Sequence, residues 1–462
     1  MWMWMPLLPR KKKGMNKMEL SQYMKLFETR TDEGKARIYI LVSEALKAVY
    51  TALTTGVFLT GFLLAGGLRP ADISIVTSIP LVAGILYPIG SLYLERFQKR
   101  RVVLGIFRLL YHSFNIFLVT VLPFFFEGEG LGKLLIFTIL LGNVANVIVA
   151  SGFPAWHIHF LPDEIRGRFF SVSGIMNSIF TALASLAASM LSDLAASSGN
   201  ELFWLGCVRG VAFLLALLEL TMLLLPKEFE YPRTLNRRPA MLWEPAGHPD
   251  FVRTMVVVFA WMALSTMTLY AANSYLLDEV GVSYTFLSVL QTCNIFVTTF
   301  VMPYWLRGQM HKGWFRVFRR VFFLFSLYPV MHAFVTERTW LWMLPVTILF
   351  YQAVLAGGNF CFGNMAYICT PKEKQTVYLS WHLTVVSLGS LAGQGTAAAF
   401  LNICQNSLYL GRLELSPSQL LLLLQGGMCF IFTLWYGKRL LKKLEKPCGL
   451  QHLHDTAKSR KI

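Results

Sequence analysis

The chain has 462 residues, of which 55% are hydrophobic and only 15% are charged, and its formal net charge is +17 at pH 7. Soluble globular domains are roughly 45–50% apolar, so this composition excludes an ordinary water-soluble protein. The basic residues are spread over short segments between long apolar runs, which argues against a nucleic-acid-binding surface.

The front part of the chain contains a basic tail followed by six apolar segments. Residues 1–37 are polar and basic, and we expect them to lie on the cytoplasmic side. About 20 apolar residues are enough for a helix to cross a bilayer. Residues 38–225 are therefore predicted to form a six-helix half. Its expected spans cover residues 38–65, 73–94, 102–126, 134–162, 169–192 and 202–225.

The back part of the chain repeats this plan. Residues 226–252 form a charged, proline-containing linker that is too short for a domain. Residues 253–437 are predicted to form a second six-helix half, and residues 438–462 a basic cytoplasmic tail that anionic lipids attract. The spans of this half cover residues 254–277, 280–306, 317–336, 339–371, 375–411 and 415–437. We therefore predict an all-α integral membrane protein with twelve transmembrane helices in two pseudo-symmetric six-helix bundles.

One loop motif occurs at the same place in both halves. The first copy lies between the fourth and fifth spans, and the second copy follows 209 positions later. Phe153, Pro162, Glu164, Phe169 and Ser171 of the first copy correspond to Phe362, Pro371, Glu373, Tyr378 and Ser380 of the second. The repeat indicates one six-helix unit written twice.

The basic residues predict the orientation of the chain in the membrane. If the N-terminus is cytoplasmic and the spans alternate, 35 of the 42 Lys and Arg residues fall on the inner side. Only Arg69, Lys133, Arg338 and Arg412 fall in outer loops. Such a bias follows the positive-inside rule, so we expect both termini to be cytoplasmic in a cell (inner or plasma) membrane.

The loop between the second and third spans resembles a known signature. Ser91-x-x-x-Glu95-Arg96-x-x-Lys99-Arg100 is similar to G-x-x-x-D-R-x-G-R-R of the major facilitator superfamily, and residues 38–437 resemble that family as a whole. The resemblance implies transport by alternating access, with Glu95, Arg96 and Arg100 latching an inner gate. Residues 154–168 resemble the corresponding loop of uncharacterised bacterial members.

Two departures from the family argue against drug efflux. No Arg or Lys occurs between Lys133 and Arg166, so the arginine that the family carries in its fourth span is missing. The Gly-Pro signature that drug/proton antiporters carry in the fifth span is absent too.

Charged residues within spans are candidates for coupling or gating, because a charge in hydrocarbon is costly. Arg209 and Glu219 lie about 15 Å apart along the sixth span. Glu219 is a candidate proton or cation site; alternatively, each residue extends to its nearer membrane face or pairs with a neighbouring helix. Glu44 is a candidate partner of Arg108 in a gate or coupling pair, or it simply lies at the inner interface beside Lys47.

Amide side chains within spans are candidates for substrate binding. Uncharged donors and acceptors beside aromatic rings suit a polar, weakly charged organic solute. The alternative is that these amides form hydrogen bonds between helices. His112 and His382 are expected to be packed polar residues rather than proton relays. The candidate substrate-binding residues are Asn143, Asn146, Asn273, Gln291, Asn294, Gln352 and Asn359.

The leading functional hypothesis is secondary active transport of a small polar organic solute, coupled to a proton or sodium gradient. No G-x-x-x-x-G-K-[ST] motif for ATP is present, and no cofactor, metal or catalytic residue is expected. We expect a monomer that contacts membrane lipids. Two alternatives stay open: a non-transporting sensor or assembly protein, and a lipid-modifying enzyme built on His157 and His159.

Overall fold

A computed structural model describes residues 28–68, 70–198, 200–229, 243–268, 272, 275–282, 284–368, 370, 375–404, 408–410 and 413–444. Residues 1–27, 445–462 and, within the predicted linker, 230–242 lie outside the described residues.

The front half consists of helices whose boundaries follow local sequence signals. Helix α2 begins after Thr31, whose side chain accepts a hydrogen bond from the Gly34 amide, and it ends at Thr54; α3 then begins at Gly56, which has a φ of +60°. The elements are α2 (Asp32–Thr54), α3 (Gly56–Ala65), α4 (Pro70–Ala83), η2 (Gly84–Leu86), α5 (Tyr87–Leu94), α6 (Arg101–His112), η3 (Ser113–Leu118), α7 (Val119–Val121), η4 (Leu122–Phe124), α8 (Gly128–His157), η5 (Ile158–Phe160), α9 (Asp163–Ser198) and α10 (Glu201–Leu224).

The back half follows the same order of helices. Gly313, at a φ of +77°, makes the tight turn between its second and third spans. Ser416 and Gln419 form a capping box that begins the last span. The elements are α11 (Glu244–Gly247), α12 (Pro249–Thr266), η7 (Tyr275–Glu279), α14 (Tyr284–Thr292), α15 (Asn294–Lys312), α16 (Trp314–Ala333), α17 (Trp340–Met365), α18 (Gln375–Ile403), β1 (Leu408–Leu410), β2 (Leu413–Leu415), α19 (Pro417–Trp435) and η9 (Tyr436–Leu440).

Each of the twelve predicted spans coincides with helical structure. Within the described residues, nine helical segments are long and apolar enough to cross a membrane. In the second predicted span the apolar helix Ser78–Leu94 is shorter than the counted ones, in the seventh α12 ends at Thr266, and the ninth, α16, begins with several arginines. These features explain why three spans fall outside that count.

A short β-hairpin lies where the sequence predicts the end of the eleventh span. Helix α18 ends at Ile403, and β1 then pairs with β2 in antiparallel register, with Leu408 opposite Leu415. The predicted span, residues 375–411, is therefore too long. The 29 residues of α18 already exceed the length needed to cross a bilayer, so the remaining apolar residues are free to form another structure.

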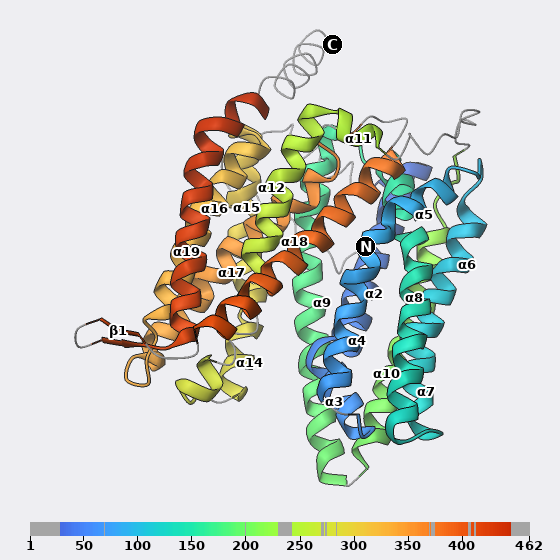
Figure 1. The fold of residues 1–462 in the computed structure, drawn as a ribbon. Coiled ribbons are helices and arrows are strands. Elements are labelled where there is room, and N and C mark those ends of the chain that lie inside the picture. The colour runs from blue at the N-terminus through green and yellow to red at the C-terminus, as the bar shows by residue number, and fades with distance from the viewer. Residues whose placement is uncertain are drawn as a thin grey trace.

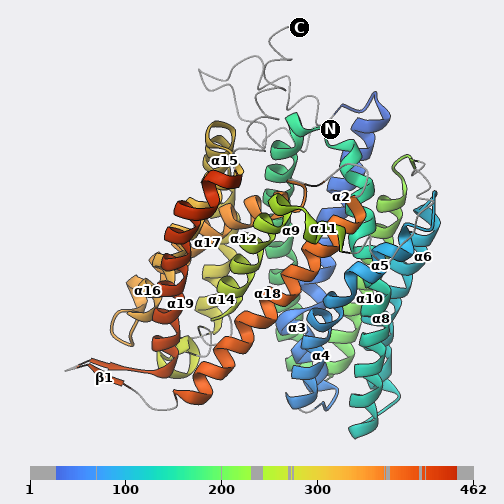
Figure 2. The same cartoon turned by 45° about the horizontal axis from the view of Figure 1, so that its top comes forward.

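The two halves stand side by side as separate helix bundles (Figure 1). Helix α18 leans from the back half across to α5 of the front half, and the view in Figure 2 shows the same contact. The bundles approach each other at the end that carries α11 and α5, and they diverge toward the end that carries α3 and β1 (Figure 1). We call the first of these the basic end, because Arg100, Arg168 and Lys312 lie there.

Candidate functional site

The halves meet along a seam between α18 and the second span, formed by η2 and α5. Thr376, Ser380 and Thr384 follow at four-residue intervals on α18, so they share one face of the helix. The Ser380 hydroxyl donates a hydrogen bond to the Ser91 hydroxyl at 3.1 Å, and the Thr384 hydroxyl donates to the Gly84 carbonyl at 3.1 Å. All three hydroxyl residues of this face are buried, so the seam is closed along its length.

Arg100, a predicted gating residue, fastens the basic end of this seam. Its guanidinium pairs with Glu95 at 3.1 Å and donates a hydrogen bond to the Thr376 hydroxyl at 2.7 Å. The Arg100 side chain is 3% exposed and that of Glu95 is 8% exposed. Arg96 is exposed, with its guanidinium 5.8 Å from the centre of the Tyr93 ring. Arg100 therefore connects the front half to the back half, and Glu95 pairs with its guanidinium from the front half.

A second seam joins α9 of the front half to α15 of the back half. A Cβ atom added to Gly167 would lie 3.2 Å from Gln309 Oε1 and 3.6 Å from Leu306 Cδ1. One added to Gly174 would lie 3.1 Å from the Met302 terminal methyl group. The two glycines allow the helices to approach closely, as small residues do in membrane bundles. We use "latch" below for the two seams together.

Corresponding residues of the two copies of the repeated loop are buried alike, within the part of the second copy that the structure describes. Phe169 and Tyr378 are 2% and 0% exposed, and Ser171 and Ser380 are 5% and 0% exposed. Tyr367 of the back half stacks on Phe170 of the front half, with ring centroids 6.0 Å apart. Pro371 and Glu373 lie outside the described residues.

A buried ion pair links the third and sixth spans inside the front half. Arg108 of α6 pairs with Glu219 of α10 at 2.6 Å, and a second contact joins them at 3.4 Å. His112 Nε2 lies 3.2 Å from the same carboxylate, and the Arg108 guanidinium donates a hydrogen bond to the Tyr50 hydroxyl at 2.8 Å. Glu219 is only 1% exposed. Glu219 therefore pairs with a neighbouring helix, which is one of the arrangements that the sequence leaves open for it.

Arg209 precedes Glu219 on α10, and it has no carboxylate partner in the described part of the chain. Its guanidinium donates hydrogen bonds to the Thr120 hydroxyl at 3.0 Å and to the carbonyls of Thr54 and Asn115 at 3.2 and 3.3 Å. The Phe62 ring centre lies 5.0 Å from its guanidinium carbon. Three acceptors and an aromatic face thus compensate a cation that is 1% exposed.

The back half has a different interior. Among the described residues, its buried side chains include no Arg, Lys, Asp or Glu. Its core is aromatic instead: the Trp261 ring centroid lies 5.3, 5.4 and 5.1 Å from those of Phe318, Phe322 and Phe325. Among the residues that the structure describes, the buried ionic network therefore lies in the front bundle.

The predicted pair between Glu44 and Arg108 is wrong. Glu44 pairs with Lys47 of its own helix at 3.6 Å, and the two side chains are 37% and 49% exposed. Arg108 is occupied by Glu219 and Tyr50. Glu44, Arg108 and Glu219 each lie six residues from the inner end of their predicted span, about 9 Å deep, so depth alone could not identify the partner.

The two most buried of the candidate substrate-binding amides serve helix packing. The Asn143 amide donates a hydrogen bond to Asn115 Oδ1 at 3.1 Å, which joins α8 to η3. Gln352 is 6% exposed, and its amide donates to the Leu290 carbonyl at 2.9 Å. The side-chain oxygen of Gln352 has no hydrogen-bond partner among the described residues.

The remaining candidate amides are more accessible. Asn146 lies beside the Tyr87 hydroxyl, and Asn294 accepts a hydrogen bond from the Thr298 hydroxyl at 3.0 Å. Gln291 and Asn359 are exposed, and Asn273 lies outside the described residues. No two of the described candidates hydrogen-bond to each other, so a common binding site for them stays a prediction.

Sequence reasoning missed three residues that complete these sites. Tyr50 and Thr376 are uncharged residues within apolar runs, and no sequence signal singles them out. His112 was expected to be an isolated packed histidine, but it contacts Glu219. Its four-residue spacing from Arg108 on the same helix was the available signal.

The histidines proposed for an enzyme do not form a reactive cluster in the structure. His157 is buried, with Nε2 3.2 Å from the Leu223 carbonyl, whereas His159 is exposed. The described residues contain no group of three His, Cys, Asp or Glu side chains that could hold a metal ion.

Several solved transporter structures resemble this fold. The human organic anion transporter MFSD10 (TETRAN) gives a TM-score of 0.65 at 12% identity, over 88% of this chain and 99% of that chain. The proton:xylose symporter XylE gives 0.64 at 14% identity, over 90% and 99%. FucP in the outward conformation gives 0.57 at 13% identity, over 86% and 98%. A sequence search of curated proteins gives no significant match.

A family model extends this likeness from fold to family. The model described as Major Facilitator Superfamily matches residues 44–394, which is most of the chain. The all-α membrane fold predicted from the sequence is thereby confirmed, and an enzymatic function is excluded. The chain belongs to the Major Facilitator Superfamily and is a multi-pass membrane transporter of the secondary type.

Proposed function

We propose that this protein carries a small polar organic solute across a cell membrane by alternating access, driven by a proton or sodium gradient. The observation that carries the proposal is the latch. Hydrogen bonds of Arg100 and of hydroxyl groups, together with small-residue contacts, join the two halves at the basic end, whereas the bundles diverge at the other end (Figure 1). Two bodies joined at one end can rock to expose a site between them to alternate sides.

The conformation is outward-facing if the basic end is cytoplasmic. The excess of Lys and Arg at this end supports that orientation. FucP, one of the structurally similar proteins, was solved in the outward conformation. Transport then requires the latch to open, which means breaking the contacts of Arg100 and Ser380 with the other half.

The substrate class is inferred from the amide side chains and from the neighbours. Asn146, Gln291 and Asn359 are uncharged hydrogen-bonding residues that are not fully buried, and such groups suit a sugar-like or nucleoside-like solute. Two similar structures are named as transporters of xylose and of nucleosides. The organic anion transporter among the neighbours makes an anion the competing class.

Two carboxylates are candidates for ion coupling, and they differ in environment. Glu44 is partly exposed and weakly paired, so it can bind and release a cation without unfolding its surroundings. Glu219 is held by Arg108 and His112 inside the front half. We therefore assign coupling to Glu44 and a structural role to Glu219.

The test is solute flux in proteoliposomes. The purified full chain is reconstituted, and uptake of labelled xylose, a nucleoside and an organic anion is measured under an imposed proton or sodium gradient. One solute should accumulate, and an ionophore should abolish its accumulation. Binding of a solute without any flux would contradict transport and favour the sensor alternative.

The coupling assignment is tested in the same vesicles. Glu44→Gln should abolish gradient-driven accumulation but retain exchange of solute at equilibrium, because the gate still moves while the ion site is lost. Lys47→Gln, which removes the partner on the same helix, should retain accumulation and serves as the control. Full accumulation by Glu44→Gln would remove this residue from the mechanism.

A further inference from the structure

A small cavity lies between α15 and α16 at the basic end, apart from the latch and from the buried ion pair. Its volume is about 130 Å³. Tyr304 and Gly308, which are one helical turn apart, line it from one face of α15. Val317 and Arg320 line it from the first turns of α16.

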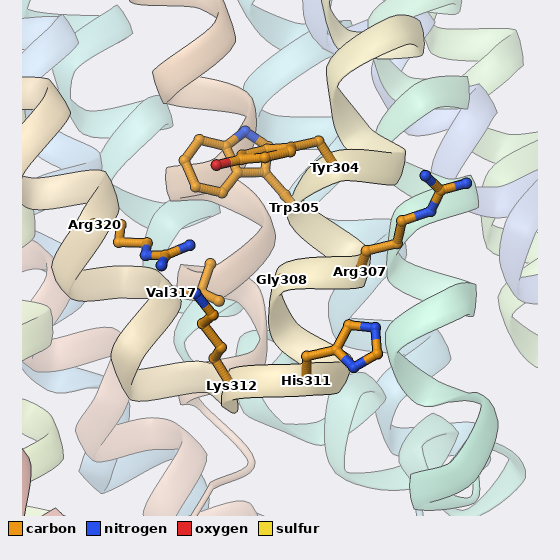
Figure 3. Close-up of a pocket in the computed structure, with 8 residues that line it drawn as sticks. All are labelled: Tyr304, Trp305, Arg307, Gly308, His311, Lys312, Val317 and Arg320. Carbon is orange, nitrogen blue, oxygen red and sulfur yellow. The ribbon is translucent and has the colours of Figure 1, made fainter.

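Two cations converge on this cavity. Figure 3 shows the Lys312 and Arg320 side chains extending into the same space beside Val317. Neither side chain has a hydrogen bond or an ion pair to any described residue of the chain. Two positive charges that share a space repel each other, so an anion between them would lower the energy. Arg307 and His311 lie on the other side of α15 and add to the positive potential (Figure 3).

Part of the cavity lining is apolar. Trp305 and Val317 are 3% and 1% exposed and form its floor. A Cβ atom added to Gly308 would meet only Val317, at 3.5 Å, so the glycine leaves this space open. Toward the N-terminal end of α15, Phe300 and Tyr304 are 79% and 59% exposed on a helix that is long and apolar enough to span the membrane. The cavity therefore presents cations at its membrane-surface end next to an apolar wall.

We propose that this cavity binds the phosphate group of an anionic phospholipid, with Lys312 and Arg320 holding the phosphate and with acyl chains lying along Tyr304 and Phe300. A free phosphate ion would satisfy the two cations but would leave the apolar wall unused. Basic pockets between helices at the cytoplasmic membrane surface are suited to acidic lipid headgroups.

The experiment compares lipid retention by the full chain and its variants. Each protein is equilibrated with mixed phosphatidylglycerol and phosphatidylcholine vesicles, extracted in mild detergent, and its retained lipid is quantified by mass spectrometry. The unmodified chain should retain phosphatidylglycerol preferentially. The Lys312→Ala/Arg320→Ala variant should lose this preference by on the order of thirty-fold, because each cation near an anionic lipid contributes a factor of about five.

Two further variants separate this site from general surface charge. Lys35→Ala/Arg101→Ala removes the same charge from exposed positions at the same end, outside the basic C-terminal tail, and should keep the preference. Gly308→Leu fills the cavity without changing charge and should lose it. The proposal is overturned if the preference survives in Lys312→Ala/Arg320→Ala, or if Lys35→Ala/Arg101→Ala loses it equally. It is also overturned if inorganic phosphate alone displaces the retained lipid.

Discussion

At the scale of single residues, the buried pair of Arg108 and Glu219 shows which features of a site the sequence predicts and which it does not. Both residues were candidates for coupling or gating because a charge within a span is costly, and the structure places them in one ion pair. The choice of partner depends on which helices are neighbours, and apolar periodicity does not specify that. Tyr50 completes the pair from a third helix.

We predict that removing one member of this pair destabilises the fold. Glu219→Gln leaves the Arg108 guanidinium without its carboxylate in a buried site, which should cost about 3–5 kcal/mol in free energy of unfolding. The measurement is thermal unfolding in lipid nanodiscs.

The double variant Arg108→Met/Glu219→Leu is the control for this prediction. Replacing a buried pair by apolar residues of similar volume is often neutral, so it should recover most of the lost stability. Unfolding of Glu219→Gln at the temperature of the unmodified protein would show that the pair contributes nothing.

At the scale of helices, glycine positions set how closely neighbours approach. A Cβ atom at Gly90 would lie 2.3 Å from the Val147 carbonyl oxygen, so α5 and α8 can pack at their present distance only without that carbon. The sequence identified spans rich in small residues but not which glycine faces which helix. That information depends on how each helix is rotated about its axis.

We predict that Gly90→Ala lowers the free energy of unfolding by about 1–3 kcal/mol, because an oversized residue forces the backbones apart. Gly61→Ala is a matched control, since nothing lies within 4 Å of the added carbon. Its stability should equal or slightly exceed that of the unmodified chain, because alanine favours helix. Equal unfolding temperatures for the two variants would contradict the packing described for α5 and α8.

The latch also predicts a reversible block of transport. Ser91 and Ser380 have hydroxyl oxygens 3.1 Å apart across the seam, so cysteines at both positions should form a disulfide on oxidation. Flux should stop in the oxidised Ser91→Cys/Ser380→Cys protein and resume on reduction, because the halves can no longer separate. The single variants, oxidised in the same way, control for native cysteines such as Cys207 and Cys293. Undiminished flux through the cross-linked protein would rule out opening of this seam.

At the scale of the whole molecule, composition and the repeated loop were sufficient to predict the fold class. Twelve apolar runs with one motif in each set of six leave few other arrangements for a membrane protein, and the family match bears this out. The site was less predictable. Glu95 and Arg100 came from a motif, whereas Thr376, which completes their latch, lies 276 positions from Arg100 and became visible only in three dimensions.

The orientation of the chain remains a prediction at this scale. An epitope tag after Ile462 should be detected only in permeabilised cells, because the positive-inside bias places both ends in the cytoplasm. A tag inserted in the loop at residues 126–128 should be detected in intact cells. The reverse pattern would turn the conformation described here into an inward-facing one.

The confinement of buried ionic groups to the front bundle limits how the two halves can be exchanged. A chimera built from two copies of the back half would keep the path of the backbone and an aromatic interior, but it would lack the Arg108–Glu219 bridge and the Arg209 anchor. The thermal stability of such a chimera should therefore resemble that of an apolar bundle and should depend little on buried charges. The two halves are therefore not expected to substitute for each other.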